Sequence, residues 1–279
     1  MSVATKEPDE FIPGVNLLRP LQSNRLLSFP FVRHGVTFRV PGLGAADGNV
    51  GYGIPRDQAD AWEMRRQWAE AIEFDATSIV GLRQVHGANV IEVRSTDAGK
   101  GAAPGSEPLG RADALFTREP GVTLMTLHAD CLPILLIDPT TPAVAAIHAG
   151  WRGTVEDVAG ATVRAMKETF RADSSQLTAF FAPSIGPCCY EVGDEVIQAW
   201  RFQAGEAFTE AIFERNGTTF LDLRRANQVL LIRAGIMPNN IEVAAVCTKC
   251  GGESWFSHRG QGPNTGRFAA FIALSGPST

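Results

Sequence analysis

Two apolar runs in the middle of the chain give the clearest structural pattern. The runs LPILLI (132–137) and AVAAI (143–147) are separated by the turn-like sequence DPTTP. Short runs of Val, Ile, Leu and Ala bounded by Pro, Asp, Thr and Gly are typical of strands that are buried on both faces. The pattern therefore predicts two neighbouring strands at the centre of the fold.

Weaker patterns of the same kind surround this pair. Further strands are expected at 26–39 with a turn near Gly35, at 78–93 as two short strands around a turn at Gly87, and at 122–127, 177–181, 241–249 and 267–274. Glycine-rich or polar stretches between them, at 41–55 and 97–110, predict loops.

Apolar residues at intervals of three and four predict the helices. Helices are expected at 57–73, from Thr154 to Phe170, from about Gly193 onward, and at 221–235. Asp157, three residues after Thr154, is close to a capping box, and Gly235 ends the last helix. Residues 202–219 have a weak pattern and are expected to be an insertion. Because strands and helices follow one another without a regular βαβ period, we expect an α+β (mixed α/β) fold.

Composition and charge exclude several classes of protein. Hydrophobic residues make up 44% and charged residues 20% of the 279 positions, which is ordinary for a globular protein with a substantial core. The net charge of -5 argues against a nucleic acid or an anionic membrane as the main partner. No apolar run approaches the roughly 20 residues of a membrane span.

The ends of the chain and its cysteines complete this outline. Residues 1–24 lack the basic region and apolar core of a secretory signal, so we expect a flexible tail there. Residues 25–279 contain no linker composition or internal repeat, which favours a single catalytic domain. Five cysteines, an odd number, fit a reducing cytoplasm better than a disulfide scaffold.

A thiol and two imidazoles lie at the ends of predicted elements. Cys131 precedes the first central run, His148 follows the second, and His86 lies at the turn in Q-V-H-G. Zinc binds imidazole nitrogen and thiolate sulfur, and catalytic zinc sites use three protein ligands with one open position. The alternative is a metal-free Cys–His dyad in which a histidine deprotonates Cys131. The spacing fits both, so both stay open.

Two neighbours of Cys131 need separate interpretations. In an unbroken strand, His128 and Cys131 are an odd number of residues apart and face opposite sides, so His128 is left out of the ligand set. Asp130 is kept as a candidate catalytic residue. Its carboxylate is expected either to orient a ligand or to accept a backbone amide.

The other four cysteines form two pairs, Cys188-Cys189 and Cys247-Thr-Lys-Cys250. A structural zinc knuckle normally shows a second C-x-x-C or H-x-x-x-H at matching spacing, and the sequence has none. We therefore expect these four residues to be buried thiols.

Three arginines in turn-like segments suggest an anion site. Arg33, Arg152 and Arg259 lie in VRHG, GWRGT and SHRG. Arg152 comes just before the predicted helix start at Thr154, where free backbone N–H groups also favour an anion. We expect a phosphate pocket here, with ordinary surface arginines as the alternative.

Several long motifs together resemble one known family. They are RQVHGANV, ADALFT, HADCLPILLIDP, AAIHAGWRGT, PSIGPCCYEVGDEV, LDLRRANQ, CTKC and the closing SHR…TGR. Over about residues 26–275 the chain resembles the YfiH-like laccase-domain or polyphenol oxidase family, whose members are regarded as purine nucleoside phosphorylases. The resemblance implies α/β/β/α layers with a mixed β-sandwich core flanked by helices. It also implies metal ligands at His86, Cys131 and His148.

The same resemblance implies a zinc-dependent reaction on small molecules. Family members convert adenosine, inosine, guanosine or methylthioadenosine with phosphate to the free base and a sugar 1-phosphate, and some also deaminate adenosine. Copper would bind to the same three residues only by misloading in place of zinc. This chain departs from the family pattern at His128, Met64 and Gly260, where Thr, Asn and a second Arg are common. These changes concern substrate preference more than reaction class.

Four other functions are alternatives to a purine nucleoside phosphorylase. A multicopper laccase needs many histidines, and five without an H-x-H pair are too few. A cytidine-type zinc deaminase needs H-x-E and P-C-x-x-C, which are absent. A metal-free cysteine hydrolase and a structural metal-binding or interaction protein remain. The structural protein would need a fourth protein ligand, most readily His128 or a cysteine of CTKC.

Overall fold

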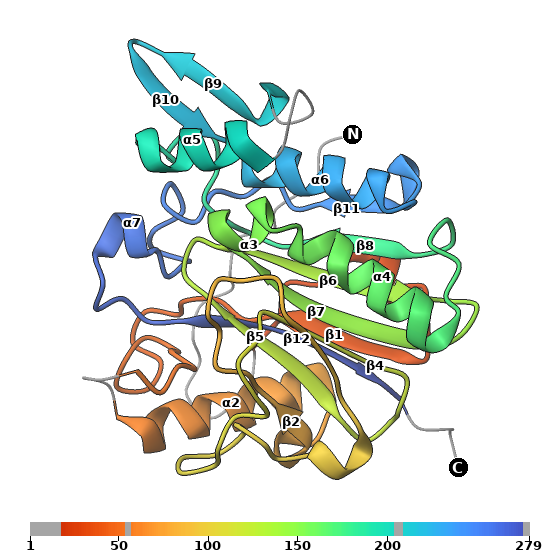
Figure 1. The fold of residues 1–279 in the computed structure, drawn as a ribbon. Helices are drawn as coiled ribbons and strands as arrows, with labels where there is room; N and C mark the ends of the chain where they lie inside the picture. The colour runs from red at the N-terminus through yellow and green to blue at the C-terminus, as the bar shows by residue number, and fades with distance from the viewer. Residues whose placement is uncertain (1–17, 54–56, 204–208, 276–279) are drawn as a thin grey trace.

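Two β-sheets form the centre of the computed structural model, which describes residues 18–53, 57–203 and 209–275. The larger sheet has the order β11-β8-β6-β7-β4-β3, and the smaller has the order β1-β12-β5-β2. Helices α3, α4 and α6 cover the larger sheet, and α2 covers the smaller one (Figure 1). The predicted mixed α/β fold with four layers is confirmed.

The larger sheet is mixed in direction. Its strands are β3 (Val90–Glu92), β4 (Ala114–Thr117), β6 (Leu132–Asp138), β7 (Ala143–Ala149), β8 (Thr178–Phe181) and β11 (Ile241–Val243). The two outer pairs, β3–β4 and β11–β8, are parallel, and the inner pairs are antiparallel.

The smaller sheet packs behind it. Its strands are β1 (Val32–Val36), β2 (Ile79–Val80), β5 (Thr123–His128) and β12 (Phe268–Leu274). A separate hairpin is formed by β9 (Ile212–Arg215) and β10 (Thr218–Leu221).

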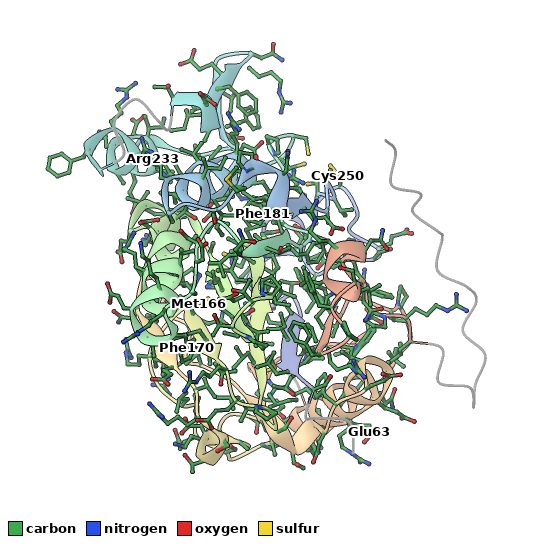
Figure 2. All side chains as sticks on the ribbon, turned by 90° about the vertical axis from the view of Figure 1, so that its right-hand side faces the viewer. Glu63, Met166, Phe170, Phe181, Arg233 and Cys250 are labelled. Carbon is green, nitrogen blue, oxygen red and sulfur yellow. The ribbon has the colours of Figure 1, made fainter. Side chains whose placement is uncertain are left out.

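The helices lie on opposite sides of the strands. They are α1 (Asn24–Leu27), α2 (Gln58–Ile72), α3 (Trp151–Val155), α4 (Val158–Phe170), α5 (Asp194–Gln203), α6 (Leu223–Arg233) and α7 (His258–Gln261). Figure 2 shows α4, with Met166 and Phe170, and α2, with Glu63, separated by the sheets.

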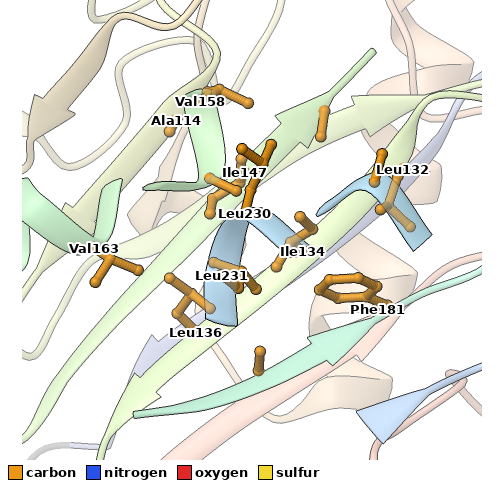
Figure 3. Close-up of a cluster of buried hydrophobic side chains, with 14 of the residues drawn as sticks. Ala114, Leu132, Ile134, Leu136, Ile147, Val158, Val163, Phe181, Leu230 and Leu231 are labelled. Atoms are coloured by element: carbon orange, nitrogen blue, oxygen red, sulfur yellow. The ribbon is translucent and has the colours of Figure 1, made fainter. Parts of the chain in front are cut away.

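Alternating side chains explain why the central runs are apolar throughout. In β6, Leu132, Ile134 and Leu136 pack against the helices of the outer layer (Figure 3). The intervening Leu135 and Ile137 pack between the two sheets. Because successive strand residues point to opposite faces, a strand between two apolar layers must be apolar at every position. The prediction of two neighbouring strands buried on both faces is confirmed.

Several predicted boundaries are wrong. Gly35 lies within β1 and not in a turn. Glycine occupies this strand position because a side chain there would come within 2.8 Å of Ile72 and Pro20. The helix predicted from Thr154 begins at Trp151 instead, and Asp157 in a left-handed conformation separates α3 from α4. Thr154 bonds to the carbonyl of Gly150 within α3.

Other differences concern the later part of the chain. The weak pattern at 202–219 contains the hairpin β9–β10, although residues 204–208 lie outside the described ranges. The strand expected over 241–249 ends at Val243, where its pairing with β8 ends. The predicted tail reaches the fold at Leu21, which pairs with Val36; residues 1–17 lie outside the described ranges.

His34 on β1 links stability to pH. Its side chain is buried, and its Nε2 accepts the amide of Ser23 at 2.9 Å, which requires a neutral ring nitrogen. Burial lowers the pKa of His34 from 6.5 to about 4, although Glu242 partly opposes this. The unfolded chain therefore binds a proton near pH 6.5 that the folded chain binds only near pH 4.

We expect this histidine to stabilise the fold above pH 6.5 and to destabilise it as the pH falls toward 4. The loss amounts to at most about 3 kcal/mol. Urea unfolding of wild type and His34→Gln at several pH values measures it, because the variant lacks this component. His258→Gln, an exposed histidine on α7, is the control. Parallel pH profiles for wild type and His34→Gln would contradict the assignment.

Candidate functional site

Three segments bring His86, Cys131 and His148 together at one end of the larger sheet. Cys131 precedes β6, His148 lies near the end of β7, and the register pairs Pro133 with His148. His86 lies in the loop between β2 and β3, and its ring centre is 4.9 Å from that of His148. The candidate ligand atoms of the three residues all lie within 4.8 Å of one another.

A buried carboxylate, Asp113, holds two of these residues in place. It accepts the Nδ1–H of His148 at 2.8 Å and the backbone amide of His86 at 2.9 Å. It also accepts the amides of Val85 and Gly87. The hydrogen bond fixes the tautomer of His148, so that its Nε2 faces Cys131 and His86. Sequence reasoning missed Asp113, although a lone carboxylate at the start of the apolar ADALFT strand indicates a buried polar role.

The electrostatics of the site favour a thiolate. Burial by itself raises the pKa of Cys131, but His148 and His86 lower it to about 6. Burial conversely lowers the pKa of His148, while Cys131 and Asp113 raise it to about 9. The thiolate is the form in which cysteine binds metals and acts as a nucleophile. Both chemistries predicted from the sequence use this form.

One side of the three-residue site is open. His86 is exposed, Cys131 is half-buried and His148 is buried. Gly150 lies directly against the site, since a Cβ on it would be 3.0 Å from Cys131 Sγ and 3.1 Å from His86 Cδ2. In the described ranges no fourth His, Cys, Asp or Glu joins these three ligands.

His128 has other hydrogen-bond partners. Its Nδ1 lies 3.1 Å from the carbonyl oxygen of Cys131, and its Nε2 lies 2.8 Å from the hydroxyl of Thr126. Burial lowers its pKa, so the ring is neutral, Nδ1 donates to the carbonyl and Nε2 accepts from Thr126. Neither nitrogen is left for a metal.

Asp130 accepts hydrogen bonds from the loop after β11 and from helix α7. Its carboxylate accepts the Thr248 hydroxyl and the backbone amide of Arg259, each at 2.6 Å. Of the two roles expected for Asp130, the structure shows the acceptance of a backbone amide. Its backbone has a positive φ of 93°, at the turn that directs Cys131 into β6.

Two of the three predicted phosphate arginines lie beside the site. Arg259 stacks over Tyr190 at 5.3 Å and donates to the carbonyl of Glu191. Arg152 forms an ion pair with Glu195 and, like Cys131 and Asp130, lies near enough to affect the charge state of Tyr190. Burial and the neighbouring Cys131 raise the pKa of Tyr190, so its hydroxyl stays protonated. Tyr190 is a second residue that sequence reasoning missed.

The third arginine is not brought to this site. Arg33 pairs with Ala273, whereas the other end of β12, at Phe268, pairs with His128. Its guanidinium forms an ion pair with Glu73 at 3.3 Å.

The remaining four cysteines are also gathered. The Sγ atoms of Cys188, Cys189, Cys247 and Cys250 lie within 4.8 Å of one another. The prediction of four buried thiols is wrong: Cys188 and Cys250 are exposed, and Cys189 and Cys247 are half-buried. Spacing could not show the cluster because its two pairs come from different loops.

Comparisons with known proteins identify the family and the fold. The family model described as multi-copper polyphenol oxidoreductase laccase matches residues 33–275. The chain belongs to this family. A family member with a solved structure, the Bacillus licheniformis hypothetical protein YfiH, superimposes with a TM-score of 0.84 at 30% identity, covering 88% of this chain and 94% of that one.

Named relatives extend the comparison to activity. A Geobacillus stearothermophilus protein named purine nucleoside phosphorylase YlmD is 36% identical over 80% of this chain and 82% of its own. A Deinococcus radiodurans protein named purine nucleoside phosphorylase is 35% identical over 94% of each chain. A prokaryotic protein named adenosine deaminase RL5 is 36% identical over 74% of this chain and 78% of its own. None of the helices in the described ranges is long and apolar enough to cross a membrane.

Asp113→Asn is expected to weaken the binding of added zinc by His86, Cys131 and His148 by about 10–100-fold, because the amide cannot accept all the N–H groups that face the carboxylate. Competition with a chromogenic chelator measures the affinity. Asp138→Asn is the matched control, since Asp138 is a buried carboxylate at the other end of β6. Equal affinities for Asp113→Asn and wild type would show that this hydrogen bond does not position His148.

Gly150→Ala is expected to prevent the binding of added zinc by His86, Cys131 and His148 while leaving the fold intact. The backbone at Gly150, with φ of -79°, accepts alanine, but the new methyl group would push Cys131 and His86 apart. Metal content and thermal unfolding measure the two effects. Gly53→Ala adds a methyl group where no atom lies within 4 Å, and serves as the control. Full zinc occupancy in Gly150→Ala would refute the steric argument.

Proposed function

We propose that this chain is an enzyme that cleaves purine nucleosides by phosphorolysis at a zinc site formed by His86, Cys131 and His148. The convergence of these three side chains, within 4.8 Å of one another and with one side open, carries the proposal. The names of its relatives as purine nucleoside phosphorylases support the substrate class.

The donor set fits zinc. Two imidazole nitrogens and one thiolate are typical zinc ligands, and a histidine that binds zinc usually donates its other ring N–H to a carboxylate, as His148 does to Asp113. Bound zinc would supply Lewis-acid chemistry to a substrate atom at its open position. A reducing compartment such as the cytoplasm would keep Cys131 available as a ligand.

The structural alternative is weaker because it needs a fourth protein ligand. Both nitrogens of His128 are engaged, and the cysteines of CTKC lie with Cys188 and Cys189 in a separate cluster. A site closed by four protein ligands is therefore not supported by the described residues. The open side argues for a reaction and not for a purely structural metal.

The other two alternatives also fit less well. A metal-free dyad needs Cys131 and one histidine, and leaves the convergence of His86 unexplained. A multicopper centre needs further histidines, whereas His34 and His128 are buried in other hydrogen bonds. We therefore propose zinc despite the copper in the family description, with copper as an ion that the same ligands would accept.

Arg152 and Arg259 are proposed to hold the phosphate. The present partner of Arg152 is Glu195, in an ion pair whose side chains are 53% and 74% exposed. Exposed pairs of this kind contribute only about 0–1 kcal/mol, so a phosphate dianion can replace the carboxylate. Tyr190, whose ring lies under the guanidinium of Arg259, is proposed to add a neutral hydrogen-bond donor.

These residues fit the charge changes of phosphorolysis. A phosphate oxygen bonds to the sugar C1′ as the bond from C1′ to the purine nitrogen breaks, and the departing purine takes up a proton. Positive charge develops on the sugar in the transition state, where a bound phosphate dianion stabilises it. The arginines therefore bind the nucleophile and orient it toward the sugar, while the open side of the ligand site accepts the base.

Deamination of adenosine is a second candidate. It is favoured by the relative named adenosine deaminase RL5, which covers most of this chain. That reaction replaces the amino group at C6 of the purine by water and needs no phosphate. Phosphate dependence therefore separates the two reactions.

Purified protein is expected to release free base from adenosine, inosine or methylthioadenosine only when phosphate is present. Chromatography of the products measures both the base and the sugar 1-phosphate. Cys131→Ala should abolish base release together with zinc binding by His86, Cys131 and His148. Arg259→Gln should raise the KM for phosphate more than it lowers kcat, because its side chain is proposed to bind phosphate.

Arg66→Gln on α2 is the control for a lost surface arginine, since Arg66 forms an exposed ion pair with Glu63. Inosine formed from adenosine without phosphate would establish deamination instead. An active wild type that contains no metal would support the Cys–His dyad. No turnover by a zinc-loaded protein would refute the enzymatic proposal.

A further inference from the structure

Four of the five cysteines lie together outside the candidate active site. Cys188 and Cys189 precede α5, while Cys247 and Cys250 follow β11. The Sγ of Cys250 is 3.5 Å from that of Cys188 and 3.4 Å from that of Cys189, and all four are free thiols. Figure 2 labels Cys250 at the edge of the molecule.

The sulfur positions match a tetrahedral zinc centre. With Zn–S bonds of about 2.3 Å, the sulfurs of such a centre are about 3.8 Å apart. The observed sulfurs lie within 4.8 Å of one another. We propose that Cys188, Cys189, Cys247 and Cys250 bind one zinc ion as a closed, structural tetrathiolate site.

Backbone amides around Cys247 favour a thiolate. The amide of Gly186 donates to Cys247 Sγ at 3.2 Å, and the amide of Cys250 bonds to the same sulfur. Gly186 has no space for a side chain, because a Cβ there would be 3.1 Å from Cys247 Cβ and 3.3 Å from Cys188 Sγ. Donors aimed at sulfur stabilise its anionic form.

Nearby cations balance the charge of such a centre. Four thiolates around one divalent ion leave a charge of about -2. Arg215 donates to the carbonyl of Cys188 at 2.9 Å, and Lys249 lies between Cys247 and Cys250 in the chain. The guanidinium of Arg224 lies against Gly186. Positive groups thus approach the cluster from three segments.

Zinc fits the position of the cluster better than iron does. A tetrahedral set of four sulfurs suits zinc or iron. Cys188 and Cys250 are exposed, so an iron centre would be open to oxygen, whereas zinc has no redox chemistry. The two pairs also come from separate loops, which a metal would join.

The site would fix loops that contact the candidate active site. Thr248, between Cys247 and Cys250, donates to the carboxylate of Asp130, and Ile185 donates its amide to the Asp130 carbonyl. Asp130 directly precedes Cys131. A closed zinc centre here would therefore position the turn that carries Cys131, without touching substrate.

Metal analysis of the intact protein, purified with reductant and loaded with zinc, tests the site. Wild type is expected to contain two zinc ions per chain, one at the proposed active site and one at the four cysteines. The four-cysteine site does not depend on the proposed function. Cys131→Ala should retain one ion, and Cys250→Ser should also retain one. The combined variant should retain none.

Each other result is decisive. A Cys131→Ala protein without zinc would overturn the inference, as would iron in place of zinc or disulfides among the four cysteines under reducing conditions. One zinc in wild type that Cys250→Ser removes and Cys131→Ala retains would support it, while the zinc-dependent function would fail.

Cobalt loading gives a second measurement if Cys250→Ser does not fold. Cobalt-loaded Cys131→Ala should show the charge-transfer and ligand-field bands of a tetrahedral centre with four thiolates. Absence of these bands in the folded, cobalt-treated Cys131→Ala protein would overturn the site. Alkylation gives a third measurement. Bound zinc should slow the reaction of the four cysteines with an alkylating reagent, and removal of the zinc by a chelator should restore that reaction.

Discussion

The Asp113 carboxylate determines whether the candidate site exists at all. It is fully buried and ionised, and it accepts hydrogen bonds from the His86 turn and from His148. Its own backbone carbonyl accepts the amide of His148 at 2.7 Å. Hydrogen bonds to a charged group contribute about 1.5–3 kcal/mol each, and a buried carboxylate without them is strongly unfavourable. The loop between β2 and β3 is thereby held against the end of β7.

The sequence predicts the layers of this fold better than its turns. The apolar runs of β6 and β7 require cover on both faces. The resemblance to the family, and not this requirement, indicates that helices cover one face and a second sheet the other. Gly35 was predicted to form a turn, but it is a glycine within β1 because Ile72 packs against its backbone. The local sequence does not show this contact. The break before α4 likewise depends on Asp157, whose left-handed backbone no periodicity reveals. A contact between distant segments decided the first position, and the local backbone conformation decided the second.

The site shows the same division. His86, Cys131 and His148 stand at the ends of predicted elements, so the sequence indicates that they could meet, and the structure brings them together. Asp113 and Tyr190 could not be identified in this way, because their roles come from partners far away in the chain. The four-cysteine cluster was missed for a related reason. Residues 188 and 250 are 62 positions apart, and only the pairing of β11 with β8 brings their loops together.

Alternating charges hold the three side chains of the candidate site close together. A thiolate at Cys131, an imidazolium at His148 and the Asp113 carboxylate alternate in sign along a line of direct contacts. Removing any one of these charges would leave a neighbouring buried charge without a partner, which is strongly destabilising. A divalent ion would replace the proton on His148 and leave the geometry unchanged, since metal binding requires neutral imidazole and thiolate ligands. A proton on His148 and a bound metal ion would thus be alternative occupants of one preformed arrangement.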